Sequence, residues 1–433
     1  MNTNDLLLRW SNMTLDQIEE EIREGKDRES VEQLLGPQTV AEMQAVSFAS
    51  PSRGAADPVV LLPGIMGSDL SSIRGVTTLV WINPLIFLHG NARYLSLAES
   101  GDRDGCPEVE MVPVGLNKLY YLKMALSLNK AAELYEFPYD WRRPIAYNAD
   151  VLHNSLERWA DGSDRKFNLV AHSMGGLVSR AYMARHPEAA EKRVRQLIMM
   201  GTPNFGATNA VETLFNGNSL MDTVNGLNRS NDMKTVVRGL PGAYNLLPVP
   251  PELYPAGMPY PADWNIYDAA SWRTAGIRQE FLDSTRDLHA LLAKSDPQLP
   301  LTMIAGCHLE TPVRLTSDFS VESMPRLVVE RIAEGEEGGD GTVPLWSALL
   351  PAAQTFYVQE KHSEIPGNRK VIQSVLRLIQ GDACELASAL PKPLIFPGLA
   401  FGVDQPPTPE ELRERIRSGT AGKDDLRAFH FAL

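Results

Sequence analysis

The sequence predicts an α/β protein with a mostly parallel central sheet flanked by helices. Apolar runs of strand composition alternate along the chain with amphipathic segments of helical period, which is the pattern of a parallel sheet covered on both faces. The first run, at 59–62, is Val-Val-Leu-Leu and stops at Pro-Gly, as a strand buried on both sides would. Further strands are expected at 108–114, 132–137, 167–171, 196–200, 301–306 and 354–358, and helices at 119–128, 148–160, 176–186, 277–294 and 366–380.

The length of 433 residues suits one large domain with insertions. Residues 1–50 are expected to form a helical appendage, because Thr14 and Gln17 have the spacing of a capping box at a helix start. A linker rich in Ser, Pro, Gly and Ala follows at 49–58. We expect the main domain over residues 58–380 and a C-terminal extension over 381–433.

Two stretches interrupt the alternation of strands and helices. Residues 81–105 contain a proline and several glycines, and residues 205–270 are long and rich in proline and aromatic residues. Long connections in a compact domain tend to be functional, and those that follow strands of an α/β sheet can cover a site. We therefore expect a cap over about 71–105 and a lid over about 207–270.

Charge and cysteine content limit the classes of partner. The formal net charge of −13 and the lack of a Lys/Arg-rich run argue against nucleic acid and against steady electrostatic attachment to anionic lipid. The three cysteines, Cys106, Cys307 and Cys384, have no zinc-site spacing and are expected to be reduced. Without a signal-peptide pattern or an apolar run of about 18 residues, we expect a cytoplasmic protein with no transmembrane segment.

Residues 168–177, Asn-Leu-Val-Ala-His-Ser-Met-Gly-Gly-Leu, predict a serine nucleophile at Ser173. An apolar strand runs into the serine, small residues surround it, and a helical pattern follows. Such a strand–turn–helix pushes the hydroxyl outward from a sharp turn. The motif is Gly-x-Ser-x-Gly with Ala171 in its first position. A plain glycine-rich turn with a capping serine is the alternative interpretation, which the matching flanks disfavour.

A serine hydroxyl needs a neighbouring base, and that base needs an orienting acid. In this arrangement the partners follow in the order serine, acid, histidine. Asp340, in Gly-Gly-Asp-Gly-Thr-Val-Pro, is the predicted acid because its glycine neighbours allow a sharp turn after a strand. A turn residue without catalytic role is the alternative. The competing acids at 334, 336 and 337 lie in a run typical of a solvated surface.

His362 is the predicted base. It follows the expected strand at 354–358 and precedes the last helix of the main domain, so its loop can deliver an imidazole to the carboxyl end of another strand. His308, which follows the expected strand at 301–306, is the rival. His172 adjoins the nucleophile and is expected to point elsewhere.

Two backbone amides are expected to form an oxyanion hole. One is the amide of Met174, the residue after the nucleophile. The other should belong to residues 63–68, Pro-Gly-Ile-Met-Gly-Ser, which follow the first strand. We choose Met66, with Ile65 as second choice; an ordinary tight turn is the alternative.

Six short segments occur in order over about 58–380. They are residues 59–70 (VVLLPGIMGSDL), 137–142 (FPYDWR), 171–176 (AHSMGG), 201–206 (GTPNFG), 340–345 (DGTVPL) and His362 with its following serine. Together and in this order they resemble the lecithin:cholesterol acyltransferase family, which includes lysosomal phospholipases and plant phospholipid:diacylglycerol acyltransferases. The resemblance implies an α/β-hydrolase fold with nucleophile Ser173, acid Asp340 and base His362. It also implies oxyanion amides at Met66 and Met174.

Two further elements follow from the same resemblance. The segment Val80-Trp-Ile-Asn-Pro84 is similar to the family's small cap, where an aromatic side chain approaches the acyl chain and the lipid surface, which implies substrate contact for Trp81. Secreted members carry a disulfide in this cap, whereas here no cysteine lies between residues 68 and 103. Asp140 and Arg142 match an element near the active-site wall, and their chemistry favours a structural ion pair.

We therefore expect a serine hydrolase that cleaves carboxylic esters through an acyl-enzyme on Ser173, with no metal or organic cofactor. The resemblance implies a lipid acyl ester as substrate and transient contact with a lipid surface. One alternative is an acyltransferase that moves an acyl chain from a phospholipid to an alcohol. Others are a hydrolase of a non-lipid ester and a non-catalytic interaction protein on a hydrolase scaffold.

Overall fold

The structure, a computed structural model, describes residues 2–50, 57–75, 77–295, 298–318, 326–333, 335, 338–393 and 407–427. Most of the expected linker at 49–58, the competing acids at 334, 336 and 337, and parts of the expected C-terminal extension lie outside these residues.

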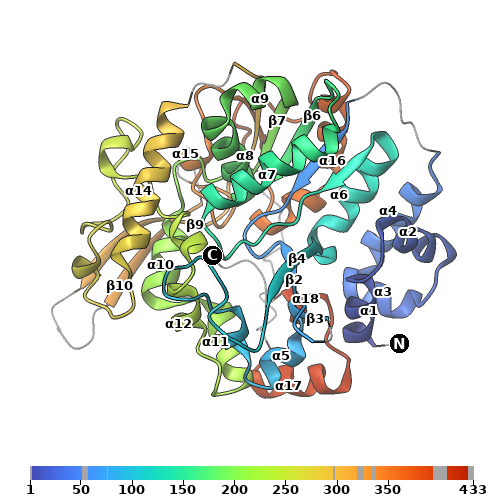
Figure 1. Ribbon diagram of the computed structural model, residues 1–433, viewed down its shortest axis with the longest axis horizontal. Coiled ribbons are helices and arrows are strands. Elements are labelled where there is room, and N and C mark those ends of the chain that lie inside the picture. The colour runs from blue at the N-terminus through green and yellow to red at the C-terminus, as the bar shows by residue number, and fades with distance from the viewer. Residues whose placement is uncertain are drawn as a thin grey trace.

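A parallel sheet forms the centre of the described chain (Figure 1). Its six strands lie in the order β11-β8-β7-β6-β1-β5, and every neighbouring pair is parallel. The strands are β1 (Val59–Leu62), β5 (Leu134–Glu136), β6 (Phe167–His172), β7 (Val194–Met200), β8 (Leu301–Gly306) and β11 (Gln354–Val358). Every residue of β1, β6 and β8 is buried, which explains their continuous apolar runs.

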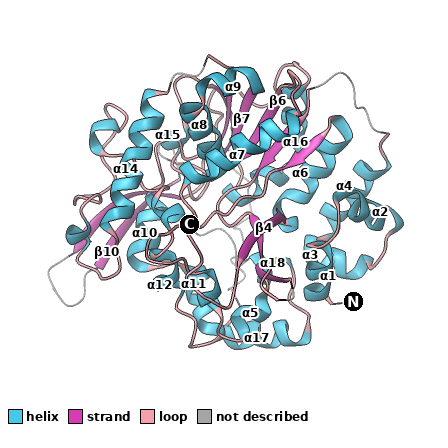
Figure 2. Cartoon of the chain, in the orientation of Figure 1, coloured by secondary structure: helices cyan, strands magenta, loops and turns pink. Residues whose placement is uncertain are grey.

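Helices pack around this sheet (Figure 2), as the alternating pattern predicts. They are α6 (Lys118–Ala131), α7 (Ile145–Ala160), α8 (Met174–Arg185), α9 (Pro187–Arg193), α14 (Gln279–Lys294), α15 (Leu345–Ala348) and α16 (Arg369–Ile379). α8 packs on β6 and β7, and α6 packs beside β5. The predicted α/β class with a mostly parallel central sheet is therefore confirmed.

The strand expected at 108–114 belongs to a different sheet. It forms at Met111–Leu116 as β4 and pairs antiparallel with β2 (Ser68–Ser72), which in turn pairs with β3 (Thr78–Trp81). Part of β4 faces solvent, with Val114 41% exposed. A half-exposed strand suits an antiparallel sheet, whereas a central parallel strand is buried on both faces.

Short elements occupy the regions expected to form cap and lid. The cap region holds β3, α5 (Pro84–Leu88) and the 3-10 helix η1 (Ala92–Leu95). The lid region holds α10 (Thr208–Asn216), α11 (Ser219–Leu227), α12 (Met233–Arg238), α13 (Pro241–Tyr244) and the 3-10 helices η2 (Pro251–Leu253) and η3 (Ala269–Trp272). A hairpin of β9 (Thr311–Asp318) and β10 (Arg326–Ile332) follows β8, and the 3-10 helix η4 (His362–Gly367) follows β11.

The N-terminal helices pack on the body of the protein and beside the C-terminal helices (Figure 1). They are α1 (Thr3–Trp10), α2 (Leu15–Glu24), α3 (Arg28–Leu35) and α4 (Pro37–Phe48), and the C-terminal helices are α17 (Pro409–Ser418) and α18 (Lys423–Arg427). The capping box expected at the start of α2 is present, since Thr14 and Gln17 bond each other's backbone amides. α4 packs on α6, while α17 contacts both α5 and α11. Within the described ranges, none of the helices has the length and apolar character needed to cross a membrane.

Candidate active site

Ser173 lies in a strained turn between β6 and α8. Its backbone has φ 52° and ψ −124°, a region that non-glycine residues rarely adopt. Close neighbours explain the small residues around it: a Cβ on Gly175 would lie 2.5 Å from the Pro63 carbonyl oxygen, and one on Gly176 would lie 2.0 Å from Thr202 Oγ1. The turn therefore needs glycine because it is wedged between the loops that follow β1 and β7.

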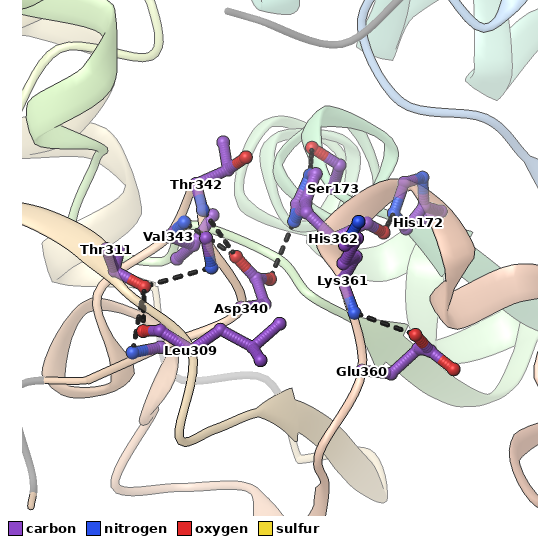
Figure 3. A network of polar contacts seen from close by, with 12 residues as sticks. His172, Ser173, Leu309, Thr311, Asp340, Thr342, Val343, Glu360, Lys361 and His362 are labelled. Carbon is purple, nitrogen blue, oxygen red and sulfur yellow. Dashed lines mark hydrogen bonds and ion pairs between the residues drawn. The ribbon is translucent and has the colours of Figure 1, made fainter. Parts of the chain in front are cut away.

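The structure brings Ser173, Asp340 and His362 together, although they are far apart along the chain (Figure 3). His362 Nε2 lies 2.9 Å from Ser173 Oγ, and His362 Nδ1 lies 2.7 Å from Asp340 Oδ2. All three lie near the carboxyl ends of parallel strands, where α/β proteins place their sites. The three residues are 4%, 2% and 4% exposed, so the cluster is largely buried.

The backbone around Asp340 determines the direction of the imidazole. Asp340 Oδ1 accepts hydrogen bonds from the amides of Thr342, at 3.0 Å, and Val343, at 2.7 Å. Only Oδ2 is then directed at the imidazole, and it accepts from Nδ1–H of His362. Nε2 is left unprotonated in the neutral ring and can accept the proton of the Ser173 hydroxyl. The rival His308 instead directs its Nε2 to the carbonyl oxygen of Pro391, 2.7 Å away.

Thr311, which the sequence analysis did not single out, holds the acid loop in place (Figure 3). Its buried hydroxyl accepts from the amides of Gly339, at 3.0 Å, and Gly341, at 2.9 Å, and donates to the Leu309 carbonyl oxygen at 2.8 Å. The hydroxyl thus fixes the residues on both sides of Asp340. No local pattern marks this threonine, because its partners are set by the return of the chain after the β9–β10 hairpin.

Gly306, the last residue of β8, leaves room for the Asp340 side chain because it has no Cβ. A Cβ at Gly306 would lie 2.3 Å from Asp340 Cβ, so Gly306→Ala must displace the carboxylate. Misplacement by about 1 Å can cost about a hundredfold in rate, so we expect kcat on a p-nitrophenyl ester to fall by at least about tenfold. Gly367→Ala is the matched control, since a Cβ there meets nothing within 4 Å. A folded Gly306→Ala protein with unchanged kcat would contradict a role for Asp340 in this geometry.

The turn after β1 offers unbonded amides near the nucleophile. Gly67 N–H closes the turn onto the Gly64 carbonyl oxygen at 3.1 Å, with Met66 at φ 60°. In the part of the chain that the structure describes, the amides of Ile65, Met66 and Met174 donate to no other protein group. A Cβ on Gly64 would lie 3.4 Å from Ser173 Oγ, so the start of this turn lies against the nucleophile.

Trp81 lies under this turn. It is fully buried, its indole N–H donates to the Met66 carbonyl oxygen at 2.8 Å, and its ring packs edge-on against Phe87 and Trp141. Substrate contact of Trp81 stays a prediction. The buried indole supports the turn at residues 64–67 through its hydrogen bond to the Met66 carbonyl oxygen.

The segment 137–142 also supports that turn. Tyr139 Oη donates to the Pro63 carbonyl oxygen at 2.8 Å, and the Trp141 indole donates to the Ser68 carbonyl oxygen at 3.2 Å. Asp140 and Arg142 form a buried two-point ion pair at 2.8 and 2.9 Å, as their chemistry favours. Removing one partner of a buried pair costs about 3–5 kcal/mol, so this pair is a structural element next to the site.

Neither the triad nor the turn includes a metal-binding set. Among the described residues no group of three or more His, Cys, Asp or Glu side chains could hold a metal ion. The groups that the cluster and the turn bring together are a hydroxyl, an imidazole, a carboxylate and backbone amides.

The parallel sheet, the strand–turn–helix serine and the order serine, acid, histidine define an α/β-hydrolase. The chain belongs to the lecithin:cholesterol acyltransferase family, whose sequence model matches residues 120–349. Lysosomal phospholipase A and acyltransferase of Homo sapiens is 26% identical over 248 residues, which cover 54% of this chain and 57% of that protein. Lecithin-cholesterol acyltransferase-like 4 of Arabidopsis thaliana is 26% identical over 201 residues, 38% of each chain. The matched part of the chain therefore spans between 38% and 57% of the length of these two curated relatives.

Solved structures show more distant likenesses. The Tle4–Tli4 complex matches with a TM-score of 0.46 and 14% identity, covering 76% of this chain and 99% of that one. The mature form of the Bacillus licheniformis lipase BlEst2 matches with a TM-score of 0.40 and 16% identity, covering 76% of this chain and 95% of that one.

Proposed function

We propose that this chain is a serine hydrolase that cleaves carboxylic esters of lipid acyl groups through an acyl-enzyme on Ser173. The proposal rests mainly on two hydrogen bonds, one between Ser173 Oγ and His362 Nε2 and one between His362 Nδ1 and Asp340 Oδ2. Membership of the lecithin:cholesterol acyltransferase family supports a lipid substrate, and relatives named as phospholipases support an ester bond within it.

In the proposed reaction His362 takes the proton of Ser173 as the hydroxyl oxygen attacks the acyl carbonyl carbon. Asp340 holds the imidazole in the required tautomer and stabilises its positive charge. The Met174 amide and an amide of the 64–67 turn, that of Met66 or Ile65, donate to the oxyanion. The imidazolium then protonates the departing alkoxide, and water, activated by the same histidine, releases the fatty acid from the acyl-enzyme.

Transfer of the acyl group to an alcohol is the second candidate. A site from which water is excluded would favour it, because another acceptor then competes better with water. The name of the human relative includes both activities. Phospholipid vesicles incubated with the protein, with and without a long-chain alcohol, separate the two: free fatty acid alone supports hydrolysis, and an alkyl ester supports transfer.

A fluorophosphonate probe tests the nucleophile directly. We expect the probe to add to the folded protein at one site, and peptide mass spectrometry to place the adduct on Ser173, because only a serine with an adjacent base is activated. Heat-denatured protein is the control and should stay unlabelled. A folded protein that resists the probe and cleaves no p-nitrophenyl ester of any chain length would contradict the proposed function and support a non-catalytic scaffold.

A further inference from the structure

The turn at residues 64–67, called the oxyanion turn below after its role in the proposed reaction, is joined to the main chain of His362 by a line of buried hydrogen bonds. The line runs through two side chains outside the triad. The Gly64 amide lies 2.8 Å from Tyr121 Oη, and Tyr121 Oη lies 2.8 Å from His172 Nδ1. His172 Nε2 in turn lies 3.0 Å from the main-chain carbonyl oxygen of His362. Both side chains are fully buried. His172 thus points away from Ser173, as expected, but it points toward the backbone of the base.

The chemistry of the end groups determines which atom carries the proton in each hydrogen bond of this line. A carbonyl oxygen can only accept, so Nε2 of His172 carries the proton that is donated to His362. Nδ1 of the neutral ring is then an acceptor, and the Tyr121 hydroxyl donates to it. The Tyr121 oxygen accepts the Gly64 N–H. One arrangement satisfies all three hydrogen bonds, with the phenol and the imidazole both uncharged.

Burial keeps both groups in that state. Desolvation and the neighbouring His362 ring lower the pKa of His172 well below its usual value. Desolvation also raises the pKa of Tyr121, so the phenol keeps its proton. Because neither group titrates at neutral pH, the line keeps one hydrogen-bond pattern over the range in which a serine hydrolase works.

The two ends of the line belong to elements that are not adjacent in the sheet. The oxyanion turn follows β1 and His362 follows β11, while His172 ends β6, which lies between them in the strand order. Tyr121 also fits beneath the turn, since a Cβ on Gly67 would lie 2.9 Å from its hydroxyl oxygen. The other main-chain group of His362, its N–H, donates to the Asp340 carbonyl oxygen at 2.9 Å.

We propose that Tyr121 and His172 are positioning residues that hold the oxyanion amides and the imidazole of His362 at a constant separation. The inference rests on the proposed function, because the oxyanion amides and His362 must act on the same carbonyl group. Their alignment matters in the transition state and little for substrate binding, so loss of the line should lower kcat more than it changes KM.

Tyr121→Phe removes the central hydroxyl and leaves the ring in place. We expect kcat on a short-chain p-nitrophenyl ester to fall by about tenfold to about a hundredfold, with KM changed by less than about threefold. The rate of fluorophosphonate labelling should fall in parallel. Tyr182→Phe is the matched control, because Tyr182 is also buried and its hydroxyl has no hydrogen-bond partner in the described part of the chain.

Substitutions of His172 separate polarity from packing. His172→Gln keeps a donor within reach of the His362 carbonyl oxygen, whereas His172→Phe fills the space without any polar atom. We expect the glutamine variant to retain more of the wild-type kcat than the phenylalanine variant. Equal kcat in the two variants, or wild-type kcat in folded Tyr121→Phe, would overturn the proposal.

Nitrogen-15 spectra of the histidine rings test the line in the unmodified protein. At neutral pH we expect His172 to give the signals of a neutral ring with its proton on Nε2, whereas a protonated Nδ1 would contradict the proposal. Failure of the wild-type protein to react with the fluorophosphonate probe overturns the proposed function instead, so the two outcomes remain distinguishable.

Discussion

Ser173→Ala is expected to lower kcat on an activated ester by on the order of 10⁴-fold or more, since no other group in the cluster can form the acyl-enzyme. The fold should tolerate the change. The substitution removes one hydroxyl from a hydrogen bond to His362, so we expect the free energy of unfolding to change by about 1 kcal/mol or less. Denaturant unfolding and steady-state kinetics on the same preparation measure both quantities.

Ser179→Ala provides the comparison on the same helix. The hydroxyl of Ser179 is buried and donates to the Gly175 carbonyl oxygen at 2.9 Å, so this variant also loses one buried hydroxyl. It should retain activity and probe labelling. Turnover by Ser173→Ala at a rate comparable to the Ser179→Ala rate would show that a different nucleophile carries the reaction.

Asp340→Asn is expected to lower kcat by about 10⁴-fold through a tautomer change. The amides of Thr342 and Val343 will hold the asparagine oxygen where Oδ1 now lies. The asparagine NH₂ group then faces His362 Nδ1 and donates to it, so the imidazole proton moves to Nε2. A protonated Nε2 cannot accept the proton of Ser173, even though every heavy atom stays in place.

A second aspartate–histidine pair supplies the control for this variant. Asp150 Oδ1 accepts from His186 Nε2 at 2.8 Å, outside the triad. Asp150→Asn therefore removes a carboxylate from a histidine without touching the site, and its kcat should equal that of the wild type. If Asp340→Asn kept more than about a tenth of the wild-type kcat, the acid would have to be a different carboxylate.

The strands of the central sheet could be predicted closely from the sequence. The expected ranges 301–306 and 354–358 match β8 and β11 residue for residue, and 59–62 matches β1. Strands buried on both faces need continuous apolar runs, and such runs are visible without any knowledge of neighbours. The strand at 108–114 was assigned to the wrong kind of sheet, because its exposed face depends on how the 68–81 hairpin folds back over it.

Other elements had no comparable local signal. The β9–β10 hairpin was not expected, since the apolar run of β10 is only the short Leu-Val-Val at 327–329 and its exposed residues are interspersed with half-buried ones. The supporting roles of Thr311, Tyr121 and Trp81 also could not be predicted from the sequence, because each depends on hydrogen bonds to backbone groups that come close only on folding.

The sequence by itself determined the parallel α/β class and the family. It also predicted the serine and the acid of the proposed chemistry, and it favoured His362 over His308 as the base. Sharp turns require glycine and small residues next to the nucleophile and the acid, so these positions are marked locally. Only the tertiary structure decided that His362 rather than His308 faces Ser173, and that His172 and Tyr121 connect the base to the oxyanion turn. The physical reason is that the order of strands in the sheet sets which loops meet, and hydrogen bonds of about 3 Å between residues far apart in sequence depend on that order.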